Sequence, residues 1–203
     1  MLRSLLLFVL MSCVGPAVAK STVLVVGDSL SAAYGLPAEQ GWVALLSERL
    51  APRGVAVVNA SISGDTSAGG AARLEAELAR SAPAVVVIAL GANDGLRGLP
   101  VEAMRANLER MILAAKARGA KVLLIGMRIP PNYGPDYTEA FHGSYAALAA
   151  KHGVALLPFL LEPIADGRAD FLDDQLHPNA GAQPKLLAHV WPALEPLLPR
   201  AGP

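Results

Sequence analysis

Short apolar runs that alternate with longer segments of helical period constrain this chain more than any other feature. The runs are rich in Val, Ile, Leu and Ala and contain few polar residues, which is typical of strands buried on both faces of a parallel sheet. They occupy residues 22–26, 55–60, 84–90, 121–125 and 154–157. Each segment between two runs is long enough to form a helix that crosses from one parallel strand to the next. The alternation therefore predicts an α/β fold.

The segments between the runs repeat apolar residues every three or four positions, as one face of a helix does. Gly54, Gly119 and Gly153 each stand just before a strand, where glycine is typical of a helix end. A last helix is predicted to begin near Pro184, with a kink at Pro192. Right-handed crossovers would assemble these elements into a three-layer α/β/α sandwich around a five-stranded parallel sheet, of flavodoxin-like type.

The first twenty residues form a separate unit. A short positive segment that includes Arg3 precedes an apolar stretch, and Ala17-Val18-Ala19 supplies the small residues that signal peptidase recognises. We expect residues 1–19 to be a signal peptide cleaved after Ala19, and residues 20–203 to be one domain that is periplasmic or secreted. The apolar stretch is too short for a stable membrane span. A lipoprotein anchored at Cys13 is the alternative, because the residues before Cys13 partly resemble a lipobox.

Composition excludes several classes of protein. The 17 basic and 17 acidic side chains balance, which argues against a nucleic-acid-binding protein. Cys13 is the single cysteine, so neither an internal disulfide nor a cysteine-based zinc cluster is expected. His142, His152 and His189 have no second histidine or carboxylate at the spacing of metal ligands. We expect no cofactor. The sequence does not determine the oligomeric state, for which a monomer is the simplest expectation.

Polar residues gather in loops that follow the predicted strands, which is where ligands bind in such folds. Ser29 follows Gly27 at the end of the first strand and is either an exposed nucleophile or a helix N-cap. Gly64, after the second strand, either brings its N–H to a ligand oxygen or only precedes a capped helix. Asn93, after the third strand, either donates to an oxyanion or stabilises a turn.

Near the C-terminus, Asp174 stands three residues before His177. At this spacing the carboxylate can fix the tautomer of the imidazole while the other ring nitrogen faces a serine, as a general base requires. Taken alone, the spacing is a weak signal, and a surface ion pair is the default interpretation. Asp173 is the alternative partner of His177, and Asp28 and Asp94 are expected to brace their loops.

Taken together and in this order, these residues resemble the sequence blocks of the SGNH hydrolases, also called the GDSL esterase/lipase family. The blocks are Gly27-Asp28-Ser29-Leu30, Gly64, Gly91-Ala92-Asn93-Asp94, and Asp174 with His177. The longer strings around them are similar to the branch of exported bacterial thioesterases, lysophospholipases and arylesterases. The resemblance extends over nearly all of residues 20–203.

The resemblance implies a role for each block. Ser29 would be the nucleophile, His177 the general base and Asp174 the residue that orients His177. The oxyanion hole would consist of the N–H groups of Ser29 and Gly64 and the side-chain amide of Asn93. Apolar residues beside these loops either line a groove for an acyl chain or belong to the core. The candidates for substrate contact are Leu96, Leu99, Ile129 and Pro130.

The function implied is a serine ester hydrolase that forms an acyl-enzyme and acts on small-molecule carboxylic esters and thioesters, including lysophospholipids. Such an enzyme would contact lipid substrates without a membrane span. A carbohydrate acetylesterase of the same fold is the second hypothesis. A non-catalytic binding protein on the same scaffold is the third.

Overall fold

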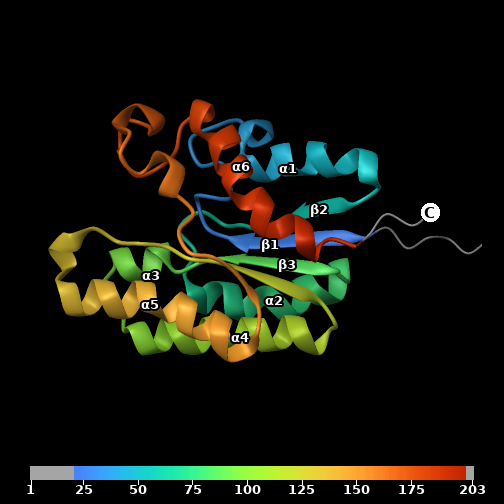
Figure 1. Cartoon of the computed structure of the whole chain (residues 1–203), viewed down its shortest axis with the longest axis horizontal. Helices are drawn as coiled ribbons and strands as arrows, with labels where there is room; N and C mark the ends of the chain where they lie inside the picture. Colours follow the sequence, from blue (N-terminus) through green and yellow to red (C-terminus); the bar gives the residue numbers. More distant parts are fainter. Residues whose placement is uncertain (1–20, 200–203) are drawn as a thin grey trace, which may run out of the picture.

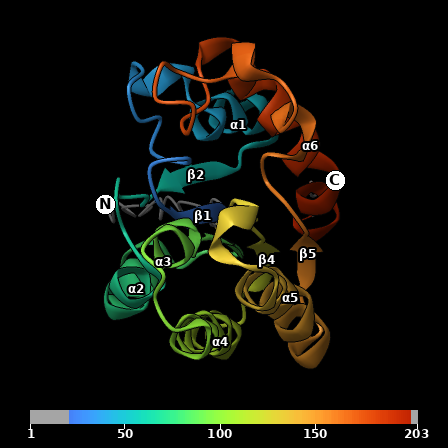
Figure 2. The same ribbon diagram turned by 90° about the vertical axis from the view of Figure 1, so that its left-hand side faces the viewer.

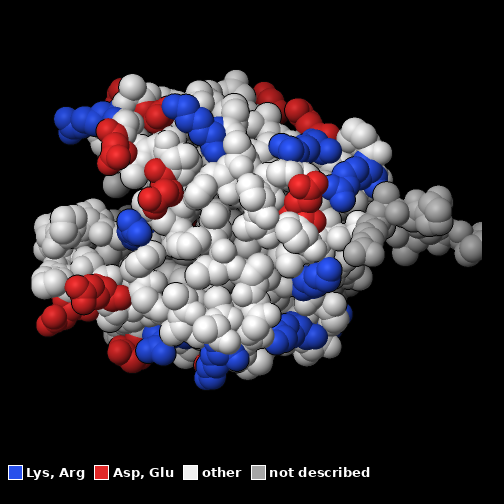
Figure 3. All heavy atoms as spheres, in the orientation of Figure 1, with Lys and Arg blue, Asp and Glu red and all other residues white. Residues whose placement is uncertain are grey.

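The structure is a computed structural model and describes residues 21–199. The predicted signal peptide at 1–19 lies outside the described residues. Figure 1 shows a central sheet with helices on both faces: α1 and α6 cover one face, and α2, α4 and α5 cover the other. The three-layer α/β/α sandwich predicted from the sequence is therefore confirmed. Among the described residues, no helix is both long and apolar enough to cross a bilayer. On the face shown in Figure 3, basic and acidic side chains are dispersed among uncharged residues.

All strand pairs in the sheet are parallel, and the strand order is β2-β1-β3-β4-β5. This is the flavodoxin-like order that the alternation predicted. The strands are β1 (Thr22–Gly27), β2 (Ala56–Asn59), β3 (Val85–Ala89), β4 (Lys121–Ile125) and β5 (Ala155–Leu157). Each end lies within one residue of the prediction. The agreement is close because the central strands β1 and β3 are buried on both faces, as their continuous apolarity indicated.

The described residues form six α-helices, and all but the short α3 lie where the apolar periodicity placed them. They are α1 (Trp42–Leu50), α2 (Ser67–Ser81), α3 (Ala92–Leu96), α4 (Val101–Ala117), α5 (Pro135–His152) and α6 (Gln183–Leu194). Single turns of 3-10 helix occupy Ala38–Gln40, Ala51–Arg53, Pro131–Tyr133, Glu162–Ile164, Arg168–Asp170, Ala180–Ala182 and Glu195–Leu197. Helix α6 begins one residue before Pro184 and continues through Pro192, which lies in its last turn.

Two local expectations were wrong. The segment from Gly91 to Gly95, expected to be a turn, is the start of helix α3: Gly91 takes a φ of +120°, and the N–H of Gly95 then donates to its carbonyl oxygen at 2.9 Å. The alternative that Ser29 is a helix N-cap is also wrong, because no helix follows it directly. The chain makes tight turns through residue 35 before α1 begins at Trp42.

The core lies on both sides of the sheet, and its largest fully buried side chains are Trp42, Tyr145 and Phe141. Burying a side chain of this kind contributes roughly 1.5–3 kcal/mol each to folding. Trp42 belongs to α1, and Phe141 and Tyr145 belong to α5. Figure 1 shows these two helices on opposite faces of the sheet. The indole N–H of Trp42 donates to the carbonyl oxygen of Leu30, after β1, and the hydroxyl of Tyr145 donates to that of Leu90, after β3.

Candidate active site

The loops that follow the strands meet at one edge of the sheet. Figure 2 looks onto this edge, with α3 beside the end of β1 and the segment that leads into α6 above it. The loop after β2 is tied to the end of β1, because the N–H of Ile62 donates to the carbonyl oxygen of Gly27 at 3.0 Å. Parallel strands bring their carboxyl ends together, and this is why residues far apart in the chain become neighbours here.

Ser29, His177 and Asp174 form a continuous chain of hydrogen bonds. The hydroxyl of Ser29 lies 2.9 Å from Nε2 of His177, although 148 positions separate the two residues. On the other side of the ring, Nδ1 of His177 lies 2.7 Å from Oδ2 of Asp174. Asp173, the alternative partner, is exposed and has no hydrogen bond to His177 among the described contacts.

The local fold keeps Asp174 ionised. Its Oδ1 accepts hydrogen bonds from the backbone N–H groups of Leu176, at 2.9 Å, and His177, at 3.0 Å. These bonds, with the side-chain bond from His177, lower the pKa of Asp174 from 3.8 to about 2. An ionised carboxylate only accepts hydrogen bonds, so Nδ1 of His177 is the protonated nitrogen. Nε2 is then free to accept the proton of the Ser29 hydroxyl.

A buried set of hydrogen bonds joins the Ser29 loop to the His177 loop. The indole N–H of Trp42 donates to the carbonyl oxygen of Leu30 at 3.2 Å. The backbone N–H of Trp42 donates to Oε1 of Gln183 at 3.0 Å, and Nε2 of Gln183 donates to the carbonyl oxygen of Pro178 at 3.1 Å. Leu30 follows Ser29 and Pro178 follows His177. Two buried side chains therefore set the spacing of the two loops, and sequence reasoning did not identify Gln183.

Asp28 and Asp94 brace their loops, as predicted. Asp28 is 1% exposed, and its Oδ1 accepts the N–H of Leu30 at 3.0 Å. Burial raises its pKa from 3.8 to about 6. Asp94 accepts both the backbone N–H and the hydroxyl of Ser67, at 2.8 and 2.6 Å. This pair of bonds joins α3 to the first turn of α2.

Of the predicted oxyanion donors, Ser29 and Asn93 line the same pocket, whereas Gly64 is not among its lining residues. One N–H of the Asn93 amide donates to the carbonyl oxygen of Asp65 at 2.9 Å, which fixes the orientation of the side chain. Gly64 has a φ of +80°, and its carbonyl oxygen accepts a hydrogen bond from Arg97 at 2.9 Å. The second amide N–H of Asn93 and the backbone N–H groups of Ser29 and Gly64 have no partner within the described part of the chain.

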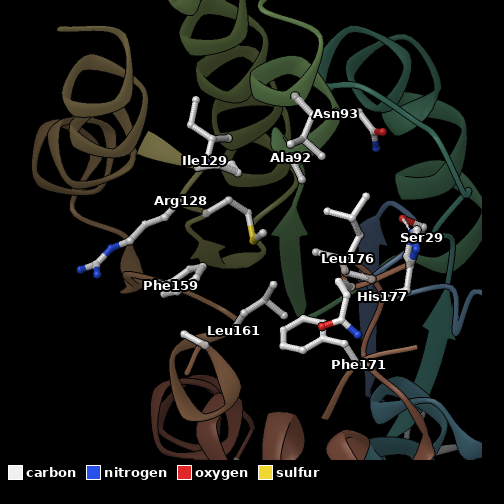
Figure 4. Close-up of a pocket in the computed structure, with 16 residues that line it drawn as sticks. Ser29, Ala92, Asn93, Arg128, Ile129, Phe159, Leu161, Phe171, Leu176 and His177 are labelled. Atoms are coloured by element: carbon white, nitrogen blue, oxygen red, sulfur yellow. Dashed lines mark hydrogen bonds between the residues drawn. The ribbon is translucent and has the colours of Figure 1, made fainter. Parts of the chain in front are cut away.

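A largely apolar pocket of about 430 Å³ opens beside Ser29 and His177. Figure 4 shows both residues on one side of the pocket, with Arg128 and Phe159 on the opposite side. Of the four residues predicted to contact substrate, Leu96, Ile129 and Pro130 line the pocket. Leu99 does not: it lies beyond α3, and its carbonyl oxygen instead accepts the hydroxyl of Tyr137 at 2.7 Å.

Part of the pocket wall was not predicted. Phe159, Leu161 and Ala165 come from the segment after β5, and Arg128 from the segment after β4. These residues could have been predicted from the rule that the loops after parallel strands surround the ligand, because the rule also applies to the loops after β4 and β5. The guanidinium of Arg128 lies 5.3 Å from the ring of Phe159, and the other Phe in the wall, Phe171, lies beside His177 (Figure 4).

Comparison with known proteins agrees with this geometry. The model of the GDSL-like lipase/acylhydrolase family matches residues 25–183. Esterase TesA of Pseudomonas aeruginosa is 57% identical over 182 residues, which cover 89% of this chain and 90% of the relative. Thioesterase 1/protease 1/lysophospholipase L1 of Escherichia coli K12 is 43% identical over 182 residues, covering 90% and 87%.

A solved structure shows the same fold. The crystal structure of the psychrotrophic esterase EstA from a Pseudoalteromonas species, inhibited by monoethylphosphonate, superposes with a TM-score of 0.83 at 40% sequence identity. The match covers 87% of this chain and 97% of EstA. Sequence, fold and relatives thus agree, and the chain belongs to the GDSL-like lipase/acylhydrolase family.

Proposed function

We propose that the protein hydrolyses carboxylic esters and thioesters through an acyl-enzyme formed on Ser29. The hydrogen-bonded chain from Ser29 through His177 to Asp174 carries this proposal, because it supplies a nucleophile, a base and an orienting carboxylate in one line. The names of the relatives, an esterase and a thioesterase/lysophospholipase, support the same reaction class.

In the acylation step, Ser29 Oγ attacks the carbonyl carbon of the substrate while Nε2 of His177 takes the hydroxyl proton. The imidazolium that results is stabilised by the carboxylate of Asp174, which stays ionised because its pKa lies near 2. His177 then gives the proton to the departing alcohol or thiol, and the acyl group remains on Ser29. Deacylation follows the same steps with water as the nucleophile. His177 takes a proton from the water as its oxygen attacks the acyl carbon, and His177 then returns that proton to Ser29 Oγ as the acid is released.

The negative charge that develops on the carbonyl oxygen needs donors. The N–H groups of Ser29 and Gly64 and the second amide N–H of Asn93 are proposed for this role, because they are unpaired in the described structure. Loss of one such donor typically costs about 3–4 kcal/mol of transition-state stabilisation. The bond from Asn93 to the carbonyl oxygen of Asp65 orients the amide before substrate arrives.

The pocket favours an acyl chain over a sugar. Its walls are mainly aliphatic and aromatic, with Leu96, Ile129 and Leu161 among them, and they offer few hydrogen-bond partners for the hydroxyl groups of a glycan. An apolar chain bound there would have its carbonyl at Ser29 and its methyl end toward Phe159 (Figure 4). Fatty-acyl, aryl and lysophospholipid esters fit this description better than carbohydrate acetates.

Export is a separate part of the proposal. Residues 1–19 have the pattern of a signal peptide, which would deliver residues 20–203 to the periplasm or the medium. The intact mass of the protein recovered from the periplasm decides this. The mass of a polypeptide that begins at Lys20 would support cleavage after Ala19. The mass of a polypeptide that begins at Cys13 and carries a lipid would contradict it.

The main test is the hydrolysis of p-nitrophenyl esters from acetate to palmitate. We expect Ser29→Ala and His177→Ala to fold, as judged by circular dichroism, and to lose at least three orders of magnitude in kcat/KM, as is usual for such residues. An optimum above acetate supports the fatty-acyl assignment, and an optimum at acetate favours the acetylesterase. Folded variants with wild-type rates would refute the mechanism.

A further inference from the structure

One aromatic ring lies directly against the imidazole of His177. The ring centroids of Tyr34 and His177 are 4.3 Å apart, and the ring planes are inclined by 36°. Tyr34 is 50% exposed. Its hydroxyl has no hydrogen-bond partner among residues 21–199. A half-exposed ring with an unpaired hydroxyl adds little to the core, so packing alone does not account for its position.

The backbone around Tyr34 is held in an unfavourable conformation. Ala33 has a φ of +59°, in the left-handed region that residues with a Cβ atom rarely adopt. Gly35 follows with a φ of +74°. The N–H of Tyr34 donates to the carbonyl oxygen of Ser29 at 3.2 Å. Two left-handed residues therefore flank Tyr34, and the turn that contains it is fastened to the residue that carries the nucleophilic hydroxyl.

The same turn is packed against the loop that carries His177. A Cβ atom on Gly35 would lie 2.6 Å from Cδ1 of Leu172, so the turn packs closely on that side chain, and the φ of +74° favours glycine there. The N–H of Leu172 in turn donates to the carbonyl oxygen of His177 at 2.8 Å. Tyr34 is thus placed relative to His177 by two contacts between the loops, one through Leu172 and one through the rings themselves.

We propose that Tyr34 is a positioning residue whose ring covers one face of the His177 imidazole and holds it in the plane shared with Ser29 and Asp174. The inference rests on the proposed function. Hydrogen bonds at Nδ1 and Nε2 fix the two nitrogens but leave the ring able to rock about the line that joins them. A rigid aromatic face opposes that motion. The electron-rich face also attracts the imidazolium that forms during acylation.

The charged group bonded to His177 is Asp174, and buried Asp28 lies near enough for His177 to affect its titration. Tyr34 adds neither charge nor a hydrogen bond to this set. Its effect should therefore depend on the aromatic face and not on the hydroxyl. This separates the proposal from a role in proton transfer or in polar binding of substrate.

The experiment compares wild type, Tyr34→Phe and Tyr34→Leu with a p-nitrophenyl ester of the preferred chain length. Phe keeps the face, so kcat should stay within about twofold of wild type. Leu keeps an apolar side chain but has no aromatic face, so kcat should fall roughly three- to tenfold while KM changes by less than about twofold. Leu113→Ala, which removes an equally exposed apolar side chain on α4, serves as the control and should change neither value.

A spectroscopic measurement distinguishes positioning from a general loss of structure. The proton between His177 Nδ1 and Asp174 gives a low-field NMR signal in such pairs. This signal should be the same in wild type and Tyr34→Phe but should shift or broaden in Tyr34→Leu, while the midpoint of thermal unfolding stays unchanged because the ring is half exposed.

Three results would overturn the proposal. Equal loss in Phe and Leu would assign the effect to the hydroxyl. A change confined to KM would make the ring a substrate contact, and wild-type behaviour of Tyr34→Leu would leave the ring without a role. Failure of the proposed function is recognised separately, since Ser29→Ala would then retain activity whatever the Tyr34 variants do.

Discussion

Replacing Gln183 by Leu tests whether the two halves of the site are held together through α6. Gln183 is 2% exposed, accepts the N–H of Trp42 at 3.0 Å and donates to the carbonyl oxygen of Pro178 at 3.1 Å. Leucine has a similar volume but no polar atom. The variant would therefore leave a buried backbone donor and a buried backbone acceptor without partners.

The magnitude follows from these two groups. An unsatisfied buried polar group costs about 1–3 kcal/mol, so the pair costs about 2–6 kcal/mol. Burial of the apolar leucine side chain offsets about 1.5–3 kcal/mol of this. Taking the middle of each range, we expect the free energy of unfolding to fall by about 2 kcal/mol. For a domain of this size the midpoint of thermal unfolding should fall by roughly 2–4 °C per kcal/mol.

Urea unfolding followed by circular dichroism measures the loss, with an unchanged slope expected because the surface exposed on unfolding is the same. Gln40→Leu is the matched control: Gln40 is exposed, and the same change there should stay within about 0.5 kcal/mol. Because Pro178 follows His177, kcat should fall as well. A Gln183→Leu variant as stable as Gln40→Leu would refute the reasoning.

Three further changes follow from the same structure. Burial raises the pKa of Asp28 to about 6, so the protonated form favours folding, and about 3 kcal/mol of stability is lost as pH rises from below 3.8 through 6. Asp28→Asn keeps an acceptor for the N–H of Leu30 but carries no charge. The variant should therefore unfold at a higher temperature than wild type at pH 8 and at the same temperature below pH 4. Equal melting curves at both pH values would contradict this. Leu161→Trp fills the pocket away from Ser29, so kcat/KM should fall for palmitate and not for acetate; a uniform loss along the ester series would show that the acyl chain lies elsewhere. In Gly95→Ala the new methyl would lie 2.6 Å from Cγ2 of Ile129, so stability should fall by about 1–3 kcal/mol in urea unfolding, and an unaffected variant would show that α3 shifts freely.

The arrangement of strands and helices was largely predictable from the sequence. The strand ends agree within one residue because a strand buried on both faces must be apolar at every position, a property visible in a few adjacent residues. The boundaries of α3 were not predictable in this way. They depend on the φ of Gly91 and on the bonds from Asp94 to Ser67 in α2, which are contacts across the fold.

The candidate site divides in the same manner. Ser29 and Asn93 could be selected because each lies in a short polar block after an apolar run. Asp174 and His177 were selected by their spacing, and the order of the blocks resembles one family. Their functional roles stay predictions until the variants are assayed. Leu99 shows the limit of the method: it lies near the correct loop in the chain, but its side chain does not line the pocket.

By itself, the sequence determined the fold class, the family and the residue types available for acyl transfer, because these depend on local composition and on the order of motifs. Only the tertiary structure decided the bridge of Trp42 and Gln183, the wall formed by Phe159 and Leu161, and the contact of Tyr34 with His177. Each of these joins segments that are distant in the chain. Their distances are set by how the layers pack on the sheet, and no local pattern of residues records that packing.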